Sequence, residues 1–202
     1  MIIGLEGVSC TGKTTLARAL AERLGASTVI PCYYHAAPDP SIIPDPAVTS
    51  EADQLHSLAV HLDIEELRWE RAHTALRRGH GVVLDRTVDT LLAHLRAVGV
   101  MAGLDANHEA RTMVEDHIAS QRAVVPSVTL LLRADDATVA GRARSRVGMP
   151  PIYYDPAFTT GFLTHFVNPI TPRVVPVDAS LPAEQVLDVV CRLLTPYLDG
   201  PS

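Results

Sequence analysis

Lysine is almost absent from this chain of 202 residues. Lys13 is the only one, and the other sixteen basic residues are arginines. A general bias toward arginine accounts for those sixteen, but it leaves the single lysine unexplained. Lysine carries a compact ammonium on a flexible stem, whereas the guanidinium of arginine is a broad planar fork. We therefore expect Lys13 to do something that arginine cannot, such as reach into a tight backbone loop.

Positive charge is also scarce, because the formal net charge is −6. This balance argues against a general binder of nucleic acid or of anionic membranes. No apolar run is long enough to span a bilayer, and no signal peptide is expected. The cysteines Cys10, Cys32 and Cys191 lie far apart, which favours free thiols in a reducing compartment. We expect a cytoplasmic protein with neither a nucleic-acid nor a membrane partner.

Short apolar runs alternate with helical patterns, which predicts an α/β fold with a parallel sheet in one domain over residues 1–202. Strands are predicted at 2–6, 27–30, 81–85, 127–132 and 174–177, and helices at 13–24, 50–78, 88–101, 106–123, 136–146 and 182–198. Pro176 places the last strand at an edge of the sheet. Prolines are frequent between residues 31 and 48, which predicts an irregular loop.

Residues Gly7 to Thr14 match the phosphate-binding pattern G-x-x-x-x-G-K-[ST], between a predicted strand and a predicted helix. The glycines let the backbone turn so that its N–H groups cradle phosphate oxygens. Lys13 is expected to reach the β- and γ-phosphates of ATP, and the Thr14 hydroxyl to ligate Mg²⁺. The expected nucleotide-binding residues here are Gly7, Ser9, Cys10, Thr11, Gly12, Lys13, Thr14 and Thr15.

Asp85 and Arg86 end the third predicted strand, on the sheet edge that carries the phosphate-binding loop. A carboxylate there can hold Mg²⁺ or accept the proton of an attacking hydroxyl. Arg86 can clamp a phosphate with two N–H groups. Glu6 ends the first strand and either orients a metal-bound water or bonds to nearby backbone. Asp85 is thus a candidate metal ligand, and Asp85 and Arg86 are candidate catalytic residues.

Three arginines, Arg142, Arg144 and Arg146, follow the fourth strand. Arg142 and Arg146 are four residues apart and are expected to share one helix face. Arginines stabilise the charge that develops on a transferred phosphoryl group, so we assign Arg142 and Arg146 a catalytic role. A solvated basic helix face is the alternative. In the proline-rich loop, Tyr34 and His35 are candidates for substrate contact.

These segments resemble thymidylate kinases and deoxynucleoside kinases. The resemblance rests on Glu6-Gly7, the loop ending Thr14-Thr15, Ala75 to Gly79, and Val82 to Arg86. The segment of about 142–155 resembles the LID of these enzymes, and Val177 to Ser180 resembles their loop near adenine. The resemblance implies a P-loop NTPase fold with a five-stranded parallel sheet flanked by helices, ATP and Mg²⁺ as cofactors, and often a homodimer. It also implies that Arg142 and Ala179 contact the nucleotide and that Arg86 contacts the substrate.

The sequence departs from that family at the acceptor side. The family usually carries Glu-Pro just after the second strand, whereas this chain has Pro31-Cys32 and no carboxylate before Asp39. Thr87 replaces the tyrosine that usually follows Asp-Arg. The sequence therefore predicts an ATP-dependent phosphotransferase acting on a nucleoside or a nucleoside monophosphate. Two alternatives stay open: a kinase of a non-nucleotide hydroxyl, such as that of an antibiotic, and a nucleotide-binding switch.

Overall fold

A five-stranded sheet lies at the centre of the computed structural model, which describes residues 1–146 and 148–198. The strands are β1 (Ile2–Glu6), β2 (Ser27–Ile30), β3 (Gly81–Asp85), β4 (Val128–Arg133) and β5 (Val174–Asp178). They run parallel in the order β2-β3-β1-β4-β5. The expected α/β fold with a five-stranded parallel sheet is therefore confirmed, and β5 lies at an edge, as its proline predicted.

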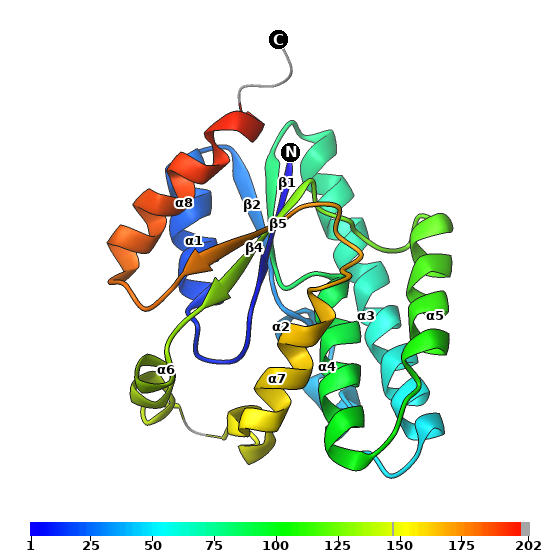
Figure 1. Cartoon of the computed structure of the whole chain (residues 1–202). Helices are drawn as coiled ribbons and strands as arrows, with labels where there is room; N and C mark the ends of the chain where they lie inside the picture. The colour runs from blue at the N-terminus through cyan, green and yellow to red at the C-terminus, as the bar shows by residue number, and fades with distance from the viewer. Residues whose placement is uncertain (147, 199–202) are drawn as a thin grey trace.

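Helices cover both faces of this sheet (Figure 1). On one side lie α1 (Lys13–Leu24) and α8 (Ala183–Leu198). On the other lie α3 (Glu51–Arg77), α4 (Val88–Ala102), α5 (Asn107–Ala119) and α7 (Pro156–His165). The remaining helical segments are α2 (Tyr33–Ala36), the 3₁₀ turns η1 (Pro40–Ile42) and η2 (Pro151–Tyr154), and α6 (Asp136–Ala143). Of the described helices, none combines the length and the apolar character that a bilayer crossing requires.

The core has two main parts. Apolar side chains of β1, β3 and β4 pack with α1 and α8 on one side of the sheet. On the other side, α3, α4 and α5 pack together with Tyr33 and Ala36 of α2. The carboxyl ends of β1, β3 and β4 meet at one edge, where Leu5 pairs with Asp85 and with Leu130.

The structure differs from the sequence prediction in the segments outside the sheet. The stretch 31–48 is not irregular throughout, because it contains α2 and η1. The helix predicted to reach residue 146 ends at Ala143, where the Arg146 N–H bonds to the Ala143 carbonyl in a tighter turn. Gly148 then adopts a φ of 79°, and Pro150 follows, so the helix cannot continue. The helix α7 and the turn η2 were not predicted.

Close packing of α7 against α4 depends on a glycine. A Cβ added at Gly161 would lie 2.7 Å from the Cα of Ala97, whereas a Cβ at Gly141, on α6, would meet nothing within 4 Å. The two positions thus form a matched pair of helical glycines that differ in the space around them.

We predict that Gly161→Ala lowers the free energy of unfolding by about 1–3 kcal/mol, because the methyl group overpacks the α4–α7 contact. Gly141→Ala is expected to raise that free energy by up to about 1 kcal/mol, since alanine favours the helix. Urea denaturation followed by circular dichroism measures both. Equal midpoints for the two variants would contradict the close approach of these helices.

Candidate active site

The loop between β1 and α1 turns sharply, as the glycine pattern predicted. Gly7, Cys10 and Gly12 have positive φ values of 135°, 64° and 93°. A Cβ at Gly7 would lie 2.3 Å from the Leu132 carbonyl oxygen of β4, so the close approach of this strand also requires glycine at position 7. The Thr11 hydroxyl donates to the Val8 carbonyl at 2.9 Å and closes the turn from inside. The loop is therefore a preformed backbone cradle at the start of a helix.

Lys13 lies inside this loop. Its Nζ donates to the carbonyl oxygens of Gly7 and Val8, both at 2.7 Å, and its side chain is buried. Burial, together with the positive charge of Arg86, lowers the pKa of Lys13 to about 7, although Asp85 and Glu6 oppose the shift. An anion bound in the cradle would favour the charged ammonium. The position suits a compact ammonium, as expected from the fact that Lys13 is the only lysine of the chain.

Asp85 and Thr14, the two expected metal ligands, are in contact. The Thr14 hydroxyl donates to Asp85 Oδ2 at 2.6 Å, and Asp85 is only 3% exposed. Within the described residues there is no cluster of three or more histidines, cysteines and carboxylates that could hold a metal ion. A hydroxyl beside a carboxylate still fits Mg²⁺, which prefers oxygen ligands and usually combines one or two carboxylates with water and substrate phosphates.

Arg86 has an unusual backbone. Its φ of 73° lies in the left-handed region, which non-glycine residues rarely adopt. Its N–H donates to the Leu5 carbonyl at 3.0 Å, and its Nη1 donates to the Thr90 hydroxyl at 3.2 Å. Such strain persists only where neighbouring groups hold it, and it is common at functional sites.

The group that holds this backbone is Arg68, which the sequence analysis missed. Arg68 is completely buried on α3. Its Nη2 donates to the carbonyl of Asp85 at 3.3 Å and to that of Arg86 at 2.5 Å, and its Nε donates to the Pro31 carbonyl at 3.0 Å. Its guanidinium lies 4.3 Å from the centre of the Tyr33 ring. One side chain therefore joins the carboxyl ends of β2 and β3.

Glu65 lies one helical turn before Arg68 on α3 and neutralises its charge. The two form a buried ion pair, and Glu65 Oε1 also accepts the Val124 N–H at 3.0 Å. Burial alone would lower the pKa of Arg68, but the charge of Glu65 outweighs it and raises that pKa above its usual value. A polar residue on the buried stripe of a long amphipathic helix is the sequence signal that could have identified both residues.

Glu6 has a structural environment. It is fully buried, and it accepts the Thr87 N–H at 2.7 Å and the Thr90 hydroxyl at 2.6 Å. Burial raises its pKa above the usual value, although Arg86 and these hydrogen bonds oppose the shift. Of the two alternatives considered for Glu6, the structure favours bonding to nearby backbone, because the carboxylate anchors the start of α4.

The arginine segment reaches the site differently from expectation. Arg142 Nη1 donates to the Cys10 carbonyl in the phosphate-binding loop at 3.4 Å. Arg146 lies beyond the end of α6 and lines the cavity described next. The expectation that Arg142 and Arg146 share a helix face is therefore wrong. Arg142 is half-buried, whereas Arg144 and Arg146 are both exposed.

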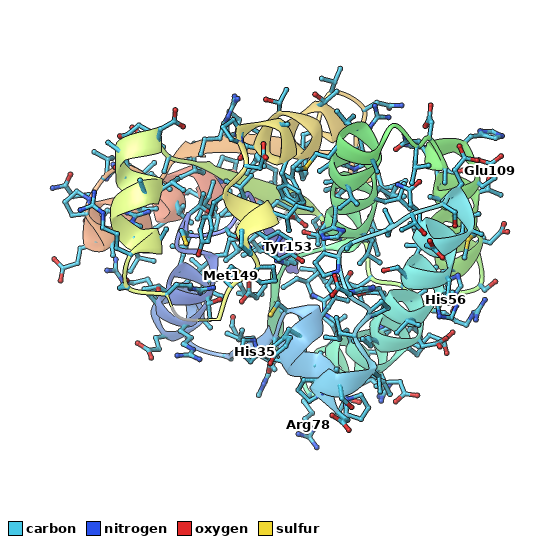
Figure 2. The ribbon with its side chains drawn as sticks, turned by 90° about the horizontal axis from the view of Figure 1, so that it is seen from below. His35, His56, Arg78, Glu109, Met149 and Tyr153 are labelled. Atoms are coloured by element: carbon cyan, nitrogen blue, oxygen red, sulfur yellow. The ribbon has the colours of Figure 1, made fainter. Side chains whose placement is uncertain are left out.

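A cavity of about 820 Å³ opens beside the phosphate-binding loop. Figure 2 views the molecule from this side, with Tyr153 and Met149 near the middle and His35 close by. The cavity has two unlike halves. We call the lining residues of the loop, together with Asp85, Arg86 and Arg146, the charged half. The neutral half is formed by α2, the following loop, α3, α4, η2 and α7. The expected contact residues Tyr34 and His35 line the neutral half, as Ser9, Cys10, Gly12, Lys13, Thr14 and Thr15 line the charged half.

Polar groups inside the neutral half were not identified from the sequence. Gln54 Nε2 donates to the Leu95 carbonyl at 3.0 Å, and its Oε1 is buried with no hydrogen-bond partner among residues 1–146 and 148–198. His94 Nε2 lies 3.2 Å from the Tyr153 hydroxyl. Burial lowers the pKa of His94 to about 3, with the charges of His61 and Arg86 acting in the same direction. This half therefore offers an open hydrogen-bond acceptor among neutral rings.

The side chain of Ala179 lines neither the large cavity nor the smaller hollow beside β5. Ala179 is buried, and its N–H donates to the Arg133 carbonyl at 2.7 Å. Its neighbours Asp178 and Ser180, with Arg133 and Asp135, line a second hollow of about 290 Å³ beyond β4 and β5. If Ala179 contributes to nucleotide binding, it does so by fixing the backbone of the segment that follows β5.

No protein-family model matches the sequence. No curated protein matches it either. Solved structures do resemble it. Deoxyadenosine kinase from M. mycoides with bound dATP is 14% identical, with a TM-score of 0.70 over 96% of this chain and 99% of that chain. The same enzyme with the products dCMP and dCDP is 14% identical, with a TM-score of 0.62 over 98% and 100%. Thymidylate kinase from Candida albicans is 18% identical, with a TM-score of 0.72 over 97% and 91%. The chain therefore has the fold of nucleoside and nucleotide kinases, as the resemblance predicted.

We predict that Arg68→Ala lowers the free energy of unfolding by about 3–5 kcal/mol, because it leaves Glu65 buried without its partner. The matched control is Arg23→Ala, which breaks an ion pair with Asp188 whose side chains are 53% and 54% exposed. That change should cost less than about 1 kcal/mol. Chemical denaturation measures both, and a similar loss in the two variants would show that the buried pair does not hold the site.

Proposed function

We propose that this chain is an ATP-dependent phosphotransferase whose acceptor is a nucleoside or a nucleoside monophosphate. The observation that carries the proposal is the contact between Thr14 and Asp85 at 2.6 Å, because both residues and Lys13 line a cavity large enough for a small molecule. The likeness to nucleoside and nucleotide kinases in fold supports it.

In this proposal the loop residues bind the triphosphate of ATP. The backbone N–H groups from Gly7 to Thr14 face the phosphate oxygens, and the Lys13 ammonium exchanges its bonds to Gly7 and Val8 for the β- and γ-phosphates. Thr14 and Asp85 would hold Mg²⁺, which would supply positive charge against the phosphates. Arg142 and Arg146 approach the same oxygens from the LID.

Asp85 and Arg86 line the cavity together with the loop residues. Arg86 keeps N–H groups that the Thr90 hydroxyl does not use, so it can orient the transferred phosphoryl group and stabilise its charge. Positioning of this kind supplies most of the catalysis in phosphoryl transfer, because the protein has little covalent chemistry to perform. Arg68 fixes both residues through their carbonyl oxygens and thus acts as a positioning residue.

The neutral half supports a planar acceptor such as a nucleobase. Aromatic rings of Tyr153, Phe158 and His94 lie with centroids 5.2–5.7 Å apart, and they provide surfaces for ring packing. The unpaired Gln54 Oε1 can accept a hydrogen bond from a ring N–H or an exocyclic amine. A flat alcohol that is not a nucleoside would pack against the same rings, so such a molecule is the second candidate acceptor. The release of ADP, measured first with nucleosides and nucleotides and then with other alcohols, distinguishes the two candidates.

We predict that Lys13→Ala lowers kcat by about 100-fold or more, because it removes the ammonium that meets the developing charge. Lys13→Arg should fail to restore activity, since the planar guanidinium does not fit a loop closed around a compact ammonium. Arg18→Ala, on the exposed face of the same helix, is the control. A coupled assay for ADP measures turnover, and circular dichroism verifies folding. Near-normal turnover of folded Lys13→Ala would rule out the proposed function.

A further inference from the structure

A single hydroxyl in the cavity wall lies between two charged side chains. Thr90 belongs to the first turn of α4, and its Oγ1 donates to Glu6 Oε2 at 2.6 Å. The same oxygen accepts an N–H from Arg86 Nη1 at 3.2 Å. A hydroxyl has one hydrogen to donate and lone pairs with which to accept, and a guanidinium can only donate, so both bonds can form at once. Thr90 therefore links the end of β1 to the side chain that follows β3.

Glu6 gives this hydroxyl a fixed partner. Its other oxygen, Oε1, accepts the Thr87 N–H at 2.7 Å and the Thr87 hydroxyl at 2.8 Å. Glu6 is fully buried, and Thr87 is the residue that caps α4. Because both oxygens of Glu6 are bound at the start of α4, the carboxylate cannot turn away without losing buried hydrogen bonds. The hydrogen of the Thr90 hydroxyl is thus committed to Glu6, and its lone pairs are left for Arg86.

The side chain of Arg86 has a freedom that its backbone lacks. Arg68 and the Leu5 carbonyl hold the C=O and the N–H of Arg86, respectively. These bonds do not fix the torsions of the long side chain, and an arginine held in one position loses much rotamer freedom. The guanidinium carries several N–H groups and gives one to Thr90, so others stay available for a phosphoryl oxygen. Arg86 and Thr90 line the same cavity as the phosphate-binding loop, so their contact lies within the site.

We propose that Thr90 is a positioning residue, which holds the guanidinium of Arg86 toward the phosphoryl group in transfer, and that Glu6 anchors it there. This inference rests on the proposed function and deepens it. A guanidinium that is held in place before the reaction meets the developing charge without reorganising. The effect of Thr90 on turnover therefore passes through Arg86.

Two substitutions of Thr90 test this role in the full chain. Thr90→Val keeps the shape of the side chain and removes its hydroxyl, whereas Thr90→Ser keeps the hydroxyl. With ATP, Mg²⁺ and the acceptor that gives the fastest release of ADP, kcat should fall by about tenfold or more in Thr90→Val. The KM for ATP should change by less than about threefold, because the loss arises in the transition state. Thr90→Ser should keep kcat within about threefold of the original value, since its hydroxyl can make the same bonds.

A matched control separates positioning from stability, because Thr90→Val also takes a hydrogen bond from buried Glu6. Thr129 is fully buried on β4, its hydroxyl donates to that of Thr171 at 3.2 Å, and it does not line the cavity. Thr129→Val should lower the free energy of unfolding, measured in urea, and leave kcat of the folded protein unchanged. If kcat falls as much in Thr129→Val as in Thr90→Val, any lost buried hydroxyl lowers activity and the positioning role is wrong.

The background Arg86→Ala shows whether Thr90 acts through Arg86. Without the guanidinium the hydroxyl has nothing to position, so adding Thr90→Val should lower kcat by less than about twofold. Transfer from radiolabelled ATP gives the sensitivity that these slow variants require. If the two losses multiply instead, Thr90 acts independently of Arg86 and the inference is overturned.

The outcomes also separate the inference from the proposed function. If the unaltered chain transfers phosphate and Thr90→Val has the same kcat, the inference is overturned and the proposed function stands. If the unaltered chain releases no ADP with nucleosides, nucleoside monophosphates or other alcohols, the proposed function fails and the positioning role fails with it.

Discussion

The guanidinium of Arg68 is the interaction on which the candidate site depends. It is buried among carbonyl oxygens that end two strands, and it bonds to both Asp85 and Arg86 through their backbones. Without these donors, the left-handed backbone of Arg86 would lack a compensating contact on its carbonyl side. The ion pair with Glu65 offsets the free energy that it costs to bury the charge of Arg68. Arg68 of α3 thus holds the backbone of Asp85 and Arg86 at the carboxyl end of β3.

The separation of charge in the cavity follows from the same arrangement. The sheet brings the carboxyl ends of β1 and β3 together, so the phosphate-binding loop, Asp85 and Arg86 share one edge. Arg68 of α3 bonds to backbone carbonyls at the ends of β2 and β3, and the residues of α3 that line the cavity are the uncharged Gln54, Ser57, Leu58 and His61. The cavity is therefore lined by charged side chains at the phosphate-binding loop and at the end of β3, and by uncharged side chains along α3.

Much of this architecture could be predicted from the sequence, because local signals agree with the fold. The strands β1, β2 and β3 are short β-branched or apolar runs bounded by turns, and Gly25 follows the last residue of α1, so the limits of these elements were predicted correctly. The helix α7 was missed because Thr159, Thr160 and Gly161 are weak helix formers, and packing against α4 stabilises it. The roles of Arg68, Gln54 and Tyr153 depend on contacts between distant elements, which periodicity within one helix does not reveal.

The most direct test of the account is the kinetics of Asp85→Asn, measured at several Mg²⁺ concentrations together with the dissociation constant of ATP. Asparagine keeps the shape of the side chain and removes its charge. The account predicts that kcat falls by about 100-fold or more, whereas the affinity for ATP changes by less than about tenfold, because the carboxylate acts at the transferred phosphoryl group. An unchanged kcat at every Mg²⁺ concentration would contradict it and would leave Asp85 as a structural partner of Thr14.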